Sequence, residues 1–100
     1  MRTLIRNKFT TPVDQSEVAR DWRKLGYSCA LFVDPPGQQW NDFVHSCDEL
    51  VMVVDGRVRM IIGDHSSDLE PGDQIFIPRG ANHSVHNIHD GQSRWLYGYN

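Results

Sequence analysis

The sequence predicts an all-β fold, a sandwich or barrel of short strands, preceded by one short α-helix. Two observations lead to this prediction. From Gly26 onward, short apolar runs alternate with turn signals about every 8–12 residues, a spacing typical of sandwiches and barrels. Only residues 14–26 carry apolar side chains at helical spacing. We expect one domain, with an N-terminal arm and helix over residues 1–26 and the β-structure over residues 27–100.

The predicted helix begins at Asp14. Asp14 and Glu17 have the spacing of a capping box, in which each side chain satisfies a free backbone N–H at the helix start. Val18, Trp22 and Leu25 follow at helical spacing, and the next residue is a glycine, a natural left-handed stop. Residues 3–9 before the helix predict an edge strand or arm. We expect the helix to cap one end of the β-structure or to brace a neighbouring element.

Seven strands are expected, over residues 27–34, 40–45, 49–54, 57–62, 74–78, 83–89 and 94–100. The dipeptide Asp55-Gly56 separates two of them and is a strong short-range hairpin signal. Residues 63–68 are polar and are expected to form a loop. Pro71 and Gly72 suit a type II turn, because proline fixes φ and glycine accepts a positive φ.

Two apolar surfaces of the predicted sheet need a cover. Leu50–Val54 is apolar on both faces, so its outer face cannot meet water. Trp95, Tyr97 and Tyr99 alternate on one face of the last strand, and an exposed aromatic stripe is unusual for a monomer. We therefore expect a homodimer in which sheets pack across a two-fold axis. The alternative is that the N-terminal helix covers the same patch.

The composition argues against several classes of partner. The net charge is −3 and there is no basic cluster, so we expect no nucleic-acid partner. No apolar run approaches the roughly 20 residues needed to cross a membrane. Residues 1–15 lack the apolar stretch of a signal peptide. Cys29 and Cys47 are the only thiols and do not make a disulfide framework. We expect a soluble cytoplasmic protein with a small-molecule ligand.

The most informative feature is a run of spaced residues in the second half of the chain. It fits the pattern G-x5-P-x-G-x2-H-x3-N and consists of Gly72, Pro78, Gly80, His83 and Asn87. A second run lies upstream, where His45 stands four residues before Glu49, and Gly56 follows after six intervening residues. Each run contributes a histidine or a carboxylate, so together they point to one small pocket that could hold a metal.

Together the two runs resemble the cupin family, a superfamily of small β-barrels or jelly rolls. The first cupin motif reads G-x5-H-x-H-x3-4-E-x6-G. Here Gly37 fits the opening glycine, while Phe43 stands where the first histidine would stand. The resemblance implies an all-β, cupin-type jelly-roll β-barrel with one short N-terminal α-helix. It also implies that His45, Glu49 and His83 bind a divalent metal.

Two imidazoles and one carboxylate are the ligand set of a facial triad, which leaves open positions for water or substrate. Such a site accepts a divalent transition metal: Fe(II), Mn(II), Ni(II) or Zn(II). The first hypothesis is a metal-dependent protein that binds a small polar metabolite. If the protein is an enzyme, the family resemblance implies a dioxygenase or an isomerase, in which Glu49 or a metal-bound hydroxide would serve as base. The second hypothesis, which Phe43 favours, is a metal-free module that binds or senses a sugar or an organic acid.

Two neighbours of the ligand positions offer alternatives. Asp42 precedes the missing histidine position, and a one-residue bulge would let it reach inward. Cys47 lies between His45 and Glu49, and in a regular strand it would share their side and favour a softer metal such as zinc. The bland interpretation of Cys47 is a small buried filler.

The remaining polar candidates are assigned to structure or surface. An odd spacing in a strand puts His86 on the opposite face from His83. His89 is expected to face away as well, and His65 to be solvated. Asp73 and Asn87 are interpreted as turn or backbone-bonding residues rather than as catalysts.

Overall fold

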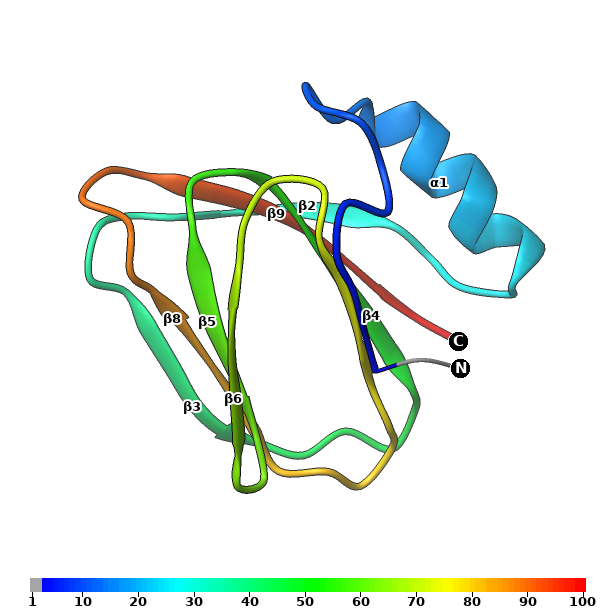
Figure 1. The fold of residues 1–100 in the computed structure, drawn as a ribbon. Coiled ribbons are helices and arrows are strands. Elements are labelled where there is room, and N and C mark those ends of the chain that lie inside the picture. Colours follow the sequence, from blue (N-terminus) through cyan, green and yellow to red (C-terminus); the bar gives the residue numbers. More distant parts are fainter. Residues whose placement is uncertain (1–2) are drawn as a thin grey trace.

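The computed structural model describes residues 3–100; Met1 and Arg2, the first residues of the predicted arm, lie outside them (Figure 1). The described residues form one helix, α1 (Gln15–Lys24), and nine strands. The strands are β1 (Leu4–Ile5), β2 (Ala30–Asp34), β3 (Gln39–Phe43), β4 (Glu49–Asp55), β5 (Val58–Ile62), β6 (His65–Leu69), β7 (Gln74–Ile77), β8 (His83–Asn87) and β9 (Ser93–Tyr99). The predicted all-β class with one short helix is confirmed.

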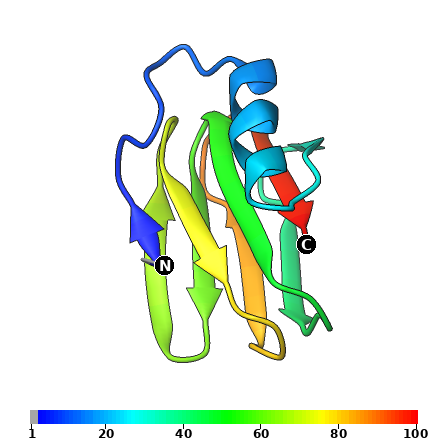
Figure 2. The same ribbon diagram turned by 90° about the vertical axis from the view of Figure 1, so that its right-hand side faces the viewer.

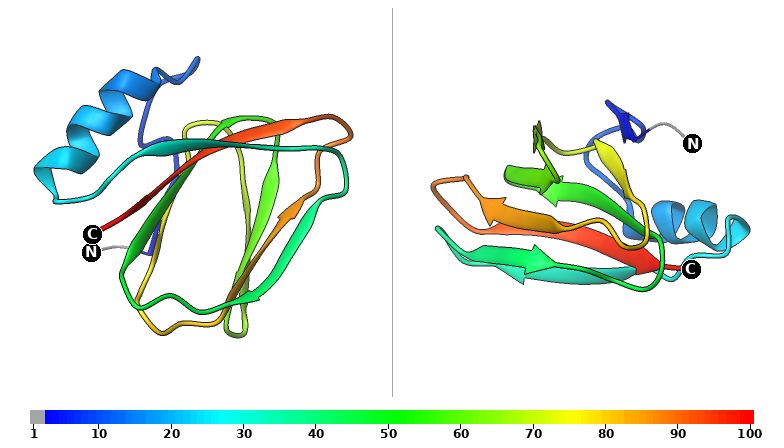
Figure 3. Two further views of the ribbon diagram at one scale, coloured as in Figure 1. Left: turned by 180° about the vertical axis from the view of Figure 1, so that it is seen from behind. Right: turned by 90° about the horizontal axis from the view of Figure 1, so that it is seen from below.

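The strands form two antiparallel sheets that face each other as a jelly roll (Figures 1 and 3). The five-stranded sheet has the order β1-β7-β4-β9-β2, and the four-stranded sheet has the order β3-β8-β5-β6. Alternate side chains of both sheets point inward and form the main core. Its buried members are Val51, Val53, Val58, Met60, Leu69, Ile75, Ile77, Val85 and Trp95. The predicted short edge strand near the N-terminus is β1, which pairs with β7.

The prediction of a hairpin at Asp55-Gly56 is wrong. The strand before it, β4, pairs with β7 and β9, whereas the strand after it, β5, pairs with β6 and β8. Gly56 has a φ of 87°, and a Cβ there would collide with the Ser93 hydroxyl. The same hydroxyl accepts a hydrogen bond from the Arg57 backbone N–H at 3.1 Å. The dipeptide therefore carries the chain from one sheet to the other.

Of the predicted loop over residues 63–68, only Gly63 and Asp64 form a turn, and residues 65–68 belong to strand β6. β6 pairs along its whole length with β5, at the edge of the four-stranded sheet. An edge strand exposes one side to water, so a polar sequence is compatible with pairing there. Arg59 on β5 forms an ion pair with Asp68 on β6 at 2.8 Å. The turn predicted after β6 is present, closed by a 3.0 Å bond from the Asp73 N–H to the Glu70 carbonyl oxygen.

The predicted helix is confirmed, but its cap differs in detail. The Asp14 side chain accepts from the backbone N–H of Ser16 at 2.9 Å, so the cap is an Asp14–Ser16 contact rather than a reciprocal pair with Glu17. Gly26, with a φ of 87°, ends the helix as expected. With ten residues, α1 is short, and no helix within residues 3–100 has the length and apolarity needed to cross a membrane.

The helix covers the outer face of β4 and β9 (Figure 2). Val18 and Trp22 are fully buried there against the outward side chains of the two strands, Leu50, Met52 and Leu96. The Trp22 indole N–H also donates to Gln74 Oε1 at 2.8 Å. This is the alternative cover proposed from the sequence. Assembly as a homodimer stays a prediction, as does a cytoplasmic location.

The aromatic stripe on β9 lies inside the molecule. Trp95 belongs to the core between the sheets, and Tyr97 packs against it. The intervening Leu96 points the other way, beneath α1. The expectation of an exposed stripe is therefore wrong, because the alternation of β9 places the aromatic side chains toward the opposite sheet.

One buried carboxylate fastens the N-terminal arm to the turn before β7. Asp73 accepts from the backbone N–H groups of Asn7 and Glu70, each at 2.9 Å, and forms a 2.8 Å ion pair with Arg6. Burial alone would raise the pKa of Asp73, but these hydrogen bonds and the Arg6 guanidinium outweigh it and lower the pKa below its usual value. The interpretation of Asp73 as a backbone-bonding residue is confirmed.

We predict that Asp73→Asn destabilises the protein by about 1–3 kcal/mol at neutral pH, because it leaves buried donors unpaired. Since the folded-state pKa of Asp73 is lowered, its contribution is present above the unfolded-state pKa and is lost as pH falls through the folded-state value. Urea unfolding at neutral and acidic pH measures both effects, and the variant should lose part of the acid sensitivity. Asp90→Asn, whose carboxylate is fully exposed, is the control. Equal stabilities of Asp73→Asn and the parent would contradict the prediction.

Candidate metal centre

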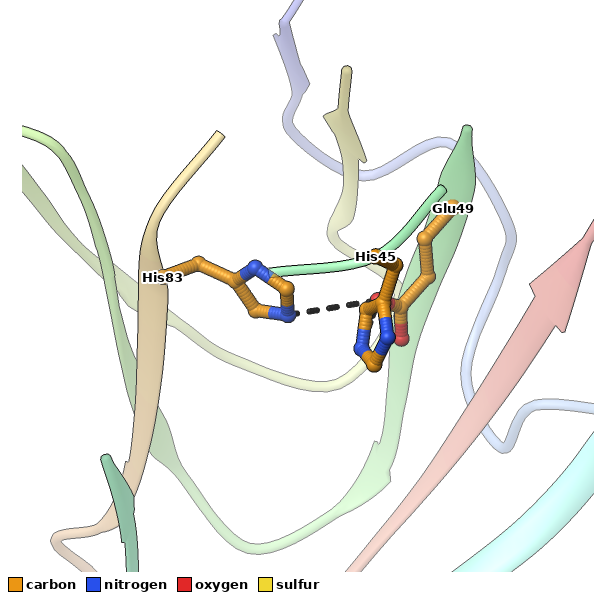
Figure 4. A group of neighbouring side chains, drawn as sticks. All are labelled: His45, Glu49 and His83. Atoms are coloured by element: carbon orange, nitrogen blue, oxygen red, sulfur yellow. Dashed lines mark ion pairs between the residues drawn. The ribbon is translucent and has the colours of Figure 1, made fainter. Parts of the chain in front are cut away.

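The structure brings together the three side chains predicted as ligands, although they come from separate segments (Figure 4). Glu49 is the first residue of β4 and His83 the first residue of β8, while His45 lies in the irregular segment between β3 and β4. The second motif supports this arrangement through its backbone. Gly80, at a φ of 79°, donates its N–H to the His45 carbonyl oxygen at 2.9 Å, which joins the two motifs.

The three side chains converge on one carboxylate oxygen. Glu49 Oε1 lies 3.6 Å from His45 Nε2 and 3.4 Å from His83 Nε2. The ligand atoms of the three residues all lie within 4.8 Å of one another. Glu49 Oε1 is buried and has no hydrogen-bond partner among residues 3–100. An unpaired buried acceptor beside two imidazole nitrogens fits a bound cation, because a divalent metal would satisfy all three groups.

His83 is held in a suitable orientation by its other ring nitrogen. Nδ1 lies 3.1 Å from the Ala81 carbonyl oxygen, and in the neutral ring Nδ1 is then the donor. This leaves the Nε2 lone pair facing Glu49, as in most metal-binding histidines. Burial alone would lower the pKa of His83, but the Glu49 carboxylate and the Ala81 carbonyl outweigh it and raise the pKa above its usual value.

The position of the missing histidine is occupied by the ring of Phe43. The ring stacks on His45 at a centroid distance of 6.0 Å and lies 6.2 Å from His83. The register of β3 against β8 shifts between Trp40 and Phe43, so an extra residue is inserted there. Because of this bulge, both aromatic side chains line the same cavity, although they are three residues apart, and Phe43 remains 38% exposed.

Neither alternative ligand joins the group. The bulge that the sequence analysis required for Asp42 is present, but Asp42 takes a φ of 61° and is exposed. Its backbone N–H donates to Ser84 Oγ at 3.0 Å. Cys47 lies in the irregular segment rather than in a regular strand, is half-buried, and is not among the residues gathered at the site.

A cavity of about 230 Å³ opens beside the three residues, and six aromatic side chains form most of its wall. They are Phe32, Trp40, Phe43, Trp95, Tyr97 and Tyr99. Val85 completes the lining together with the candidate ligands. Sequence reasoning missed most of this wall. The alternation of residues 95, 97 and 99 was a signal for it, but we assigned that stripe to the surface.

Tyr99 places a hydroxyl group next to the candidate ligands. Its oxygen lies 3.5 Å from His45 Nε2. Burial, with smaller contributions from Glu49, Tyr97 and Cys47, raises the pKa of Tyr99 to about 12. The phenol is therefore neutral at physiological pH and can donate a hydrogen bond toward the centre.

The other polar candidates lie where the sequence analysis placed them, outside the site. His86 points away from the cavity and contacts Asn41 Oδ1 at 2.7 Å. His89 and His65 are exposed. Asn87 is a backbone-bonding residue, since its amide donates to the carbonyl oxygens of three residues, Asp34, Pro35 and Gly91.

Comparison with known proteins agrees with this description. A protein of Thermus thermophilus is 27% identical in sequence and superposes with a TM-score of 0.67 over 73% of this chain and 71% of its own. Oxalate oxidase in complex with the substrate analogue glycolate is 25% identical, with a TM-score of 0.69 over 76% of this chain and 42% of its own. A DMSP lyase from Ruegeria pomeroyi shares the fold at 21% identity and a TM-score of 0.67, over 74% of this chain and 38% of its own.

Two further matches come from the sequence, one with a relative and one with a family model. An uncharacterised protein of Streptomyces coelicolor is 27% identical over 66 residues, which are 66% of this chain and 63% of that protein. The chain therefore spans less than two thirds of this relative and less than half of oxalate oxidase. The family model for the cupin domain matches residues 30–99, which include every strand from β2 to β9. This chain belongs to the cupin family.

Proposed function

We propose that this protein holds one divalent transition metal at His45, Glu49 and His83 and binds a small polar metabolite in the adjoining cavity. The observation that carries the proposal is the buried Glu49 Oε1, which has no hydrogen-bond partner among the described residues. Leaving a buried acceptor unpaired costs about 1–3 kcal/mol. A cation between this oxygen and the two Nε2 atoms, 3.4 and 3.6 Å away, would remove that cost.

The roles of the side chains follow from their surroundings. The metal, when bound, would polarise oxygen atoms of the ligand as a Lewis acid. His83 and His45 would be neutral ligands, and Glu49 would supply the negative charge. The neutral Tyr99 hydroxyl would donate a hydrogen bond to a ligand oxygen. The aromatic wall would exclude water and strengthen these polar contacts.

A small carboxylate is the ligand group that best suits the centre. Oxalate oxidase, which this chain resembles at 25% identity, was solved with the hydroxy acid glycolate as substrate analogue. We propose a reaction of the classes that the family implies, dioxygenation or isomerisation. In an isomerisation, Glu49 is the group placed to take a proton from the substrate.

The alternative is a metal-free binding protein, and Phe43 is the observation that favours it. Where a fourth ligand would lie, an aromatic ring stacks on His45. A protonated His83 would also form a stable pair with Glu49 without any metal, since its pKa is raised. Metal analysis separates the two functions.

We predict that the purified parent protein retains about one equivalent of a transition metal. His83→Ala should lower the affinity of the protein for that metal more than about 100-fold, because it removes a direct ligand. Loss of a hydrogen-bond partner outside the coordination sphere has a smaller effect. Elemental analysis and metal titration measure this. His86→Ala is the matched control, because it removes a histidine from the same strand that points away from the cavity. Equal metal content in the parent and in His83→Ala would contradict the ligand assignment.

Phe43→His should raise the metal affinity by at least about tenfold, or about 1.4 kcal/mol, because it adds an imidazole beside His45 and His83. Phe43→Leu is the matched variant, since it removes the ring without adding a ligand. Competition with a chelator measures both affinities. The prediction fails when the two variants bind metal equally well.

A further inference from the structure

The aromatic side chains of the cavity form a closed circuit. Starting from Phe32, ring centroids are 5.5 Å apart to Trp40 and 6.2 Å from there to Phe43. On the other side, Phe32 lies 5.3 Å from Trp95, which lies 5.8 Å from Tyr97. The circuit closes through Tyr99 and His45, with centroid distances of 5.9, 5.1 and 6.0 Å along the path Tyr97, Tyr99, His45 and Phe43. A ligand inside this circuit is in contact with π faces and edges on most sides.

The two ends of the circuit carry different polar groups. The candidate metal centre lies at the Tyr99 end. At the other end, the Trp40 and Trp95 indole N–H groups both donate to Asp34, at 3.0 Å to Oδ1 and 2.9 Å to Oδ2. Asp34 is fully buried, and no basic side chain among residues 3–100 forms an ion pair with it. A carboxyl group that accepts on both oxygens has the hydrogen-bond pattern of the ionised form.

This arrangement makes the Trp40–Trp95 end attractive to cations. The face of an indole is negative, and tryptophan gives the strongest cation–π contacts. The Asp34 carboxylate, which accepts from both indole N–H groups, lies at the edge of the two rings, where it adds a negative charge and makes the rings richer in electrons. The apolar surroundings screen that charge poorly. A bare anion would be repelled at this end. A sugar would find few hydrogen bonds there, because both indole donors are already used by Asp34.

We infer that the Trp40–Trp95 end of the cavity is a subsite for an alkylated organic cation, such as a quaternary ammonium group. The inference deepens the proposed function and rests on it for the opposite end, where the candidate metal would take a carboxylate. The ligand class is then a small zwitterion of the betaine type. Its cationic group lies against Phe32, Trp40 and Trp95, and its carboxylate lies next to His45, Glu49 and His83.

Matched pairs of probes test the subsite directly. Choline and its uncharged isostere tert-butylethanol have almost the same shape and differ in charge, and neither carries a carboxylate. Glycine betaine and the tert-butylacetate anion (3,3-dimethylbutanoate), in which carbon replaces the cationic nitrogen, form the second pair. Binding is measured by calorimetry at constant ionic strength, on the protein as purified and after removal of metal with a chelator. We expect choline to bind about 5- to 30-fold more tightly than its isostere, with or without metal.

The variants Trp40→Phe and Trp40→Leu assign the preference to the ring. The phenylalanine variant keeps a weaker π face, so its preference for choline should be smaller but present. In the leucine variant the preference should be smaller again, because only Phe32, Trp95 and the Asp34 carboxylate remain at this end. Asp34→Asn, checked for folding by circular dichroism and thermal melting, should also reduce the preference. If Asp34→Asn does not fold, the comparison of Trp40→Leu with the parent still tests the subsite.

The outcomes separate this inference from the proposed function. Equal binding of choline and tert-butylethanol to the parent, tighter binding of the uncharged probe, or no binding of either overturns the cation subsite. A preference for choline that is as large in Trp40→Leu as in the parent overturns its location. Loss of the extra affinity of glycine betaine over choline after chelation supports the metal centre, whereas an unchanged ratio argues against the centre and leaves the subsite standing.

Discussion

The central strand β4 is buried on both faces, and the rest of the structure depends on this constraint. Its outward side chains, Leu50 and Met52, require the cover that α1 supplies through Val18 and Trp22. Its inward side chains follow the same alternation and begin with Glu49, which therefore faces the opposite sheet. A shift of one residue in register would turn Leu50 and Met52 toward the opposite sheet and the Glu49 carboxylate toward the helix. The position of the candidate metal centre is thus fixed by the packing of the strand that carries it.

Local signals in the sequence predicted the parts of this fold that are determined locally. The helix begins at the residue after Asp14, and the spaced motifs brought His45, Glu49 and His83 to one place. The errors concern pairing. A turn dipeptide such as Asp55-Gly56 indicates that the chain turns, but it does not indicate whether the next strand joins the same sheet. Alternation along β9 likewise shows that one face is aromatic without showing which face is inside, because that depends on where α1 packs.

Phe43 connects the two halves of the site. At the position where the first histidine of the family motif would stand, it removes a ligand from the centre and at the same time completes the aromatic circuit between Trp40 and His45. The bulge in β3 is required for this, since it turns both aromatic side chains inward. The phenylalanine therefore leaves the candidate centre with one ligand fewer than the family motif and extends the apolar wall beside it. A three-ligand centre with a larger aromatic cavity is suited to a ligand that gains much of its affinity from the wall.

Two buried carboxyl groups are compensated differently by the fold: Glu49, which lines the cavity, and Asp34, which is bonded to two indoles of its wall. Burying a charge is costly unless hydrogen bonds or counter-charges compensate it. Asp34 is compensated by two indole donors, one on each carboxyl oxygen. Glu49 Oε1 has no such donor and faces the two imidazoles, so its compensation has to come from a proton on a histidine or from a cation. With a metal cation bound beside Glu49 and a carboxylate at Asp34, the cavity would discriminate by the separation of charge within the ligand. Shape and hydrogen bonding contribute less, because most of the wall is aromatic.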